Sequence, residues 1–155
     1  MRLLAVGLFA LFLAGCGEDN SAERAAEREE RLEQQQQELQ EIEDMVRAEL
    51  GELDESWSEL EFLDSRKGSY RFAIIYREDI PTPSQRDVSH DTSEVVRATL
   101  KTLMDTGTNP REEWVNIYVH ARQAAGTGET GAQLVRPLGR SSYNYNTDQI
   151  EFELP

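Results

Sequence analysis

The sequence predicts an α+β fold, in which a long acidic N-terminal helix precedes a small domain whose mostly antiparallel sheet packs on one helix. Residues 21–58 contain no proline and are dominated by Glu, Gln, Arg, Ala and Leu, which favour helices. Short runs of β-branched and aromatic residues follow, and these favour strands. A single segment with helical apolar spacing lies between these runs. That order of elements is typical of the α+β class.

The acidic residues are concentrated near the N-terminus. The net charge of the chain is −14, and residues 17–55 account for −11 of it, with fifteen acidic and four basic side chains. Nucleic acid is bound by clustered Lys and Arg, so we expect no nucleic-acid partner. The same charge offers no attraction to anionic lipid, and any attachment to a membrane must therefore be hydrophobic.

Residues 1–15 have the pattern of a signal peptide. Arg2 precedes an apolar run of twelve residues, Leu3 to Ala14. A membrane-spanning helix needs about 20 apolar residues, so this run is too short to be a permanent span. It has the length of the apolar region of a secretory signal.

The run ends in Leu13-Ala14-Gly15-Cys16, and the chain becomes polar immediately afterwards. This tetrapeptide resembles the lipobox of bacterial lipoprotein precursors. The resemblance implies cleavage between Gly15 and Cys16 and attachment of acyl chains to the Cys16 thiol. Two or three acyl chains make a durable anchor, because each buried CH₂ contributes about 0.8 kcal/mol. Cys16 is the only cysteine, so no intrachain disulfide can form.

The residue after the cysteine bears on location. In Gram-negative lipoproteins, by the same resemblance, an aspartate at that position signals retention in the inner membrane. Here it is Gly17, which implies an outer-membrane location facing the periplasm. A Gram-positive surface lipoprotein is the alternative.

Residues 16–20 are interpreted as the lipidated terminus and tether, and residues 21–58 as a helical stalk. Apolar residues recur at an interval of seven along it: Ala25, Leu32, Leu39, Val46, Leu53 and Leu60. A second, mostly polar seam makes this a weak coiled-coil pattern. Three interpretations stay open, namely weak homo-oligomerisation through the stalk, a solvated single helix, and packing of the helix on the C-terminal domain.

Residues 60–155 are expected to form the small α+β domain and to fold without residues 17–55. A helix is expected to begin at Asp91–Glu94, to run through Met104 and to be capped by Gly107, and 126–131 reads as a loop. Within 114–122 the apolar residues occupy every second position, starting at Val115. The alternation predicts a strand with these residues in the core and with the others, among them Asn116 and His120, facing outward. Strands are predicted at 60–63, 70–76, 114–122, 133–138 and 148–154.

The most suggestive polar surface lies at 136–146. Two arginines and two tyrosines there are candidates for recognition of a glycan or a peptide: Arg136, Arg140, Tyr143 and Tyr145. The alternative is a turn or bulge with pendant tyrosines.

No catalytic residue, metal ligand set or cofactor site is predicted. His90 lies beside Asp87 and Asp91, but a loop that starts a helix explains this arrangement better than a metal site does. The glycine-rich loop 126–131 lacks the lysine of a phosphate-binding loop. We therefore expect a lipid-anchored envelope protein with a non-enzymatic binding or structural role, whose partner is an envelope protein or glycan. The alternative is an envelope enzyme acting on glycan or peptide.

Overall fold

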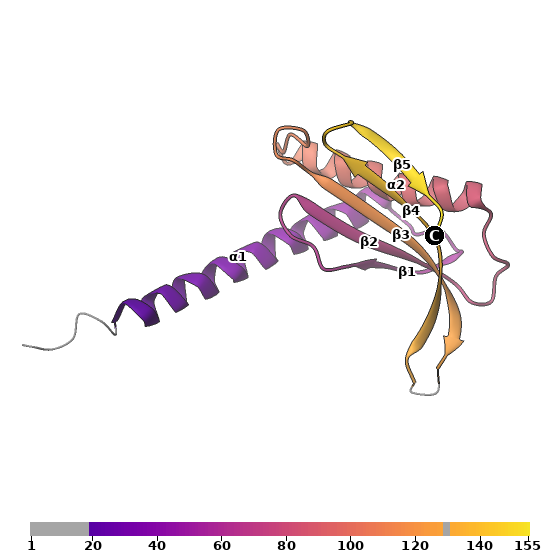
Figure 1. The fold of residues 1–155 in the computed structure, drawn as a ribbon, viewed down its shortest axis with the longest axis horizontal. Helices are drawn as coiled ribbons and strands as arrows, with labels where there is room; N and C mark the ends of the chain where they lie inside the picture. Colours follow the sequence, from indigo (N-terminus) through magenta and orange to yellow (C-terminus); the bar gives the residue numbers. More distant parts are fainter. Residues whose placement is uncertain (1–18, 129–130) are drawn as a thin grey trace, which may run out of the picture. The chain divides into compact units, whose positions relative to one another are not determined.

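The computed structural model describes residues 19–128 and 131–155, and Figure 1 shows its elements. The predicted signal peptide, lipobox and Cys16 lie outside the described residues. Within them, no helix combines the length and the apolar character that crossing a membrane requires. The elements are α1 (Asp19–Leu50), β1 (Trp57–Phe62), β2 (Ser69–Tyr76), α2 (Gln85–Asp105), β3 (Asn116–Thr127), β4 (Gln133–Asn144) and β5 (Gln149–Glu153).

The chain divides into two units, residues 1–34 and 35–155. The described part of the first unit is helical, and its side chains from residue 24 onward are exposed. Leu32, for example, is 52% exposed. This helical segment carries no buried apolar side chain of its own among those described.

The second unit contains one sheet in the order β1-β2-β3-β4-β5. Strands β2 and β3 are parallel and are joined through α2, whereas the other neighbouring pairs are antiparallel. The α+β class and the mostly antiparallel sheet are therefore confirmed. Strand β3 lies at the centre, and its residues Ile117, Val119 and Ala121 are buried as the alternation predicted.

One face of the sheet, which we call the inner face, forms the core. On β2 and β3 its residues are matched in register, because Phe72 pairs with Val119 and Ile74 with Ala121. Helix α2 covers this face, and its buried apolar side chains join the same cluster: Val88, Val95, Val96, Ala98 and Leu103.

The last turns of α1 also belong to this core. Val46 is completely buried, and Leu39, Ile42 and Leu50 pack against the same cluster. Their spacing of three, four and four residues is that of one helical stripe. The expectation that residues 60–155 form a core without residues 17–55 is therefore wrong, and the sheet packs on two helical segments instead of one.

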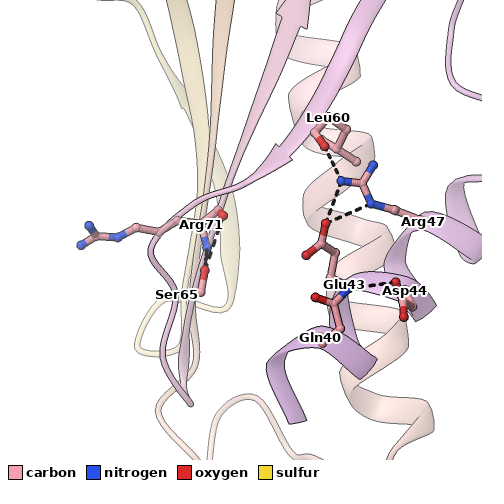
Figure 2. Close-up of polar contacts among 7 residues, drawn as sticks. All are labelled: Gln40, Glu43, Asp44, Arg47, Leu60, Ser65 and Arg71. Atoms are coloured by element: carbon pink, nitrogen blue, oxygen red, sulfur yellow. Dashed lines mark hydrogen bonds and ion pairs between the residues drawn. The ribbon is translucent and has the colours of Figure 1, made fainter. Parts of the chain in front are cut away.

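An arginine fixes α1 to the edge strand. Arg47 donates a 2.5 Å hydrogen bond to the carbonyl oxygen of Leu60 on β1, and its ion pair with Glu43 measures 2.7 Å (Figure 2). Glu43 and Arg47 are four residues apart, the spacing at which oppositely charged side chains meet on a helix. Because Leu60 is on an outer edge of the sheet, this contact also occupies a carbonyl that would be open to another strand.

Two helix boundaries differ from the predicted ones. Helix α1 ends at Leu50 and not near residue 58, because Gly51 adopts a left-handed conformation (φ 70°) that few other residues tolerate. Leu53 therefore lies beyond the helix and Leu60 on a strand. Helix α2 begins at Gln85 rather than at Asp91–Glu94, because Ser84 and Asp87 form a reciprocal capping box.

Three strands also differ, and the first of them, β1, begins at Trp57, ahead of the predicted residue 60. Trp114 precedes β3, with φ at 56° and a side chain that is 70% exposed, so the strand starts at Asn116 and continues to Thr127. Strand β4 runs to Asn144, well past the predicted residue 138. Its pairing with β3 shifts by one residue between Pro137 and Gly139. At Gly139 a Cβ atom would lie 2.7 Å from the Phe152 ring, so only glycine fits.

Candidate binding site on the outer face of the sheet

The outer face of the sheet, opposite the core, holds a cluster of basic and aromatic side chains. The arginine–histidine cluster consists of Arg71 on β2, Tyr118, His120 and Arg122 on β3, and Arg140 on β4. In register, His120 lies directly opposite Arg140, and Arg71 lies opposite Tyr118. Side chains at such positions are direct neighbours on a sheet. Figure 2 shows that the Arg71 side chain projects away from α1.

Carboxylates on the two outer strands flank this cluster. Arg140 pairs with Glu153 at 2.6 Å, and Arg122 lies 4.0 Å from Glu61. The Arg122–Glu61 pair spans β2, and Ala73 beneath it is completely buried. Arg71 lies over the Tyr118 ring, with its guanidinium carbon 5.9 Å from the ring centre, a cation–π distance. The outer face is thus basic along its middle strands and acidic along its margins.

A cavity of about 320 Å³ opens beside the cluster. This volume is at the lower end of the range that small-molecule sites occupy, roughly 300–1,000 Å³. Its lining combines charged side chains with apolar groups and backbone: His120, Ala121, Arg122, Pro137, Gly139, Arg140, Glu153, Leu154 and Pro155.

The surroundings of His120 favour its neutral form. Partial burial lowers the pKa of His120, and the nearby charges of Arg122, Arg140 and Arg71 lower it further. A neutral imidazole presents one donor and one acceptor nitrogen. The three arginines therefore hold a positive potential at this position, although the whole chain is strongly acidic.

This effect predicts a pH dependence. An unfolded chain binds the His120 proton near pH 6.5, whereas the folded chain binds it only at lower pH. The contribution of His120 to stability is therefore complete above that pH and declines as the pH falls towards the folded-state pKa. Two-dimensional NMR titration should give a midpoint below that of a free histidine, and Arg140→Gln should raise it. A midpoint unchanged by Arg140→Gln would contradict this electrostatic account.

The four surface residues proposed from the sequence do not form one surface. Tyr143 is only 3% exposed and belongs to the core, where its hydroxyl donates to Asp148 at 3.0 Å. Tyr145 packs against the core from its edge. Arg136 donates to Thr82 and to Gln123. Only Arg140 lies on the outer face. Segment 136–144 continues a strand, so alternate side chains point to opposite faces.

Sequence reasoning identified one strand of this site but not the site itself. The alternation of 114–122 places His120 and Arg122 outward, as the structure has them. Arg71, the neighbour on β2, could not be identified from the sequence. Residues 70–76 form a mostly apolar run, so the pattern does not show which of their side chains face outward. The parallel pairing of β2 with β3 brings Arg71 beside Tyr118.

A second cavity, of about 260 Å³, lies where α1 ends near α2. Asp91 at its side accepts hydrogen bonds from the Trp57 indole at 3.1 Å and from the Tyr76 hydroxyl at 2.6 Å. Burial and the hydrogen bond to Asp91 raise the pKa of the Tyr76 hydroxyl far above its usual value. His90 lies 3.9 Å from Glu94. In residues 19–128 and 131–155, no three His, Cys, Asp or Glu side chains are grouped closely enough to hold a metal ion.

Comparisons of the chain with protein-family models, with curated proteins and with solved structures find no match.

Proposed function

We propose that this chain is a lipid-anchored lipoprotein of the bacterial envelope with a non-enzymatic binding role. The observation that carries the proposal is Leu13-Ala14-Gly15-Cys16, which follows a twelve-residue apolar run and precedes a polar stretch. A thiol is the nucleophile that accepts a diacylglyceryl group as a thioether. Small residues before it let an extended backbone enter a membrane-embedded peptidase. Gly17 after the cysteine supports the outer membrane, facing the periplasm, as the location.

The binding role is supported by the outer face of the sheet. Helix α2 and residues 35–50 of α1 contribute their apolar side chains to the inner face, so they leave the outer face to other contacts. That face carries the arginine–histidine cluster and the 320 Å³ cavity. A polar face with a small cavity is suited to recognising a ligand in the envelope.

Replacing Cys16 by serine tests the anchor. In cells fed an alkyne analogue of palmitate, the wild-type protein should be labelled and should fractionate with membranes until detergent is added. Cys16→Ser should carry no label, because serine offers no thiol for the thioether. Gly17→Asp is the matched control: it keeps the thiol and should keep the label, while in a Gram-negative host it moves to the inner membrane. Label retained on Cys16→Ser would contradict the proposal.

A catalytic role is the second candidate, and one observation favours it. The 320 Å³ cavity gathers His120 and the carboxylate of Glu153, which acid–base chemistry uses, together with Arg122, which can stabilise a developing negative charge. Against it, Glu153 is engaged by Arg140 at 2.6 Å. Incubation with envelope glycan or peptide, followed by mass spectrometry, discriminates the two. Product formed by the wild type and lost in His120→Gln would establish the enzyme instead of the binding role.

A further inference from the structure

Resting on the proposed binding role, we propose that the cavity beside His120 binds the oxyanion of a small ligand, a carboxylate or a phosphate, between Arg122 and Arg140. The two arginines line the same cavity from neighbouring strands, β3 and β4. Guanidinium groups match the geometry of both oxyanions, because their planar donors form paired hydrogen bonds.

The charge within the cavity favours an anion. Its charged side chains are two arginines and one glutamate, while His120 is held in its neutral form. Of the charges next to the cavity, Arg71 adds a positive one from β2 and Glu61, 4.0 Å from Arg122, adds a negative one from β1, so three arginines face two glutamates. An oxyanion placed there would be attracted by this excess of positive charge, whereas a cation would be repelled.

The arginines retain donors for a ligand. Arg140 uses Nε and Nη2, both directed at one oxygen of Glu153 at 2.9 and 2.6 Å. Its third nitrogen, Nη1, forms no hydrogen bond with the part of the chain that the structure describes. Arg122 lies 4.0 Å from Glu61, which is too long for a hydrogen bond. A ligand oxyanion therefore adds contacts without displacing strong ones.

The rest of the lining limits the ligand further. Pro137 and Leu154 give the cavity an apolar wall, and Leu154 is exposed. A cavity of about 320 Å³ has room for an oxyanion with a short apolar tail. An N-acylated amino acid has this chemistry, and so does a short phosphate ester.

The test uses the full-length protein in a non-ionic detergent and follows the His120 ring signals by NMR. The probes are N-acetylalanine, its uncharged amide, and inorganic phosphate. Saturable shifts are expected with at least one of the two anions and not with the amide, and the anion that binds more tightly identifies the oxyanion class. A bound anion should also raise the pKa of His120, because it offsets the neighbouring arginine charges.

Three variants make the test specific. Arg122→Gln and Arg140→Gln should each weaken anion binding about tenfold or more, because a charge-assisted hydrogen bond is lost. Arg97→Gln, on the exposed side of α2, is the matched control and should bind as the wild type does. Equal responses to the acid and the amide, no saturable shift with either anion, or equal weakening in all three variants would overturn the proposal. Acylation of Cys16 is measured in a separate experiment. The result for anion binding is therefore independent of the result for the lipid anchor.

Discussion

Val46→Asp is expected to destabilise the second unit by about 3 kcal/mol or more, whereas Leu32→Asp should cost less than about 1 kcal/mol. Both residues belong to the same seven-residue apolar repeat and lie on α1. Val46 is completely buried among core side chains, while Leu32 is 52% exposed. A carboxylate at position 46 loses its hydration without gaining a partner, and at position 32 it remains in water.

Urea unfolding measures this difference, with fluorescence of the buried Trp57 as the probe. Trp114 is largely exposed, and its Phe variant removes the second signal. Equal destabilisation at the two positions would mean that the whole repeat is buried, as in a coiled coil. No destabilisation at Val46 would mean that α1 is dispensable for the fold.

Ile117→Ala is expected to lower the free energy of unfolding by about 2–5 kcal/mol, the usual cost of a large cavity in a core. Ile117 lies on the central strand β3 and has no exposed surface. Asn116→Ala, on the opposite face of the same strand, is the matched control and should cost well under half as much. Its side chain donates a 3.3 Å hydrogen bond to the Trp114 carbonyl, in an exposed position.

The same urea titration measures both variants. Comparable losses at positions 116 and 117 would contradict the assignment of inner and outer faces. His120 and Arg122 point to the same face of β3 as Asn116. That result would therefore also remove the geometric basis of the candidate site.

Much of the fold follows from local patterns in the sequence. The run 70–76 and the alternation around Ile117 each indicate a strand, and the structure has β2 and β3 there. The ends of the helices and strands were harder to predict. The Ser84–Asp87 capping box lies in a polar stretch without apolar periodicity, so the first turns of α2 were missed.

The role of α1 was not decidable from its pattern. A seven-residue apolar repeat is compatible with packing against a partner helix and with packing against the surface of a sheet. In the structure Val46 belongs to the hydrophobic core of the sheet domain, and Leu39 packs against that core. Sequence spacing alone carries no information about which surface is nearer.

The candidate site was only partly predictable for a similar reason. Strand alternation orients His120 correctly, but a binding surface needs neighbours from other strands. Those neighbours depend on sheet order and on the parallel register that sets Arg71 beside Tyr118. Residues 136–146 were expected to present one polar surface, but residues 136–144 belong to β4, where alternate side chains point to opposite faces of the sheet.

Intact mass spectrometry of the protein isolated from its native envelope tests the central proposal most directly. The account predicts a chain that begins at Cys16 and exceeds the mass of residues 16–155 by a diacylglyceryl group, with a further acyl chain in many Gram-negative hosts. Fragmentation should place this added mass on Cys16. A membrane-isolated chain with an unmodified Cys16 would contradict the account.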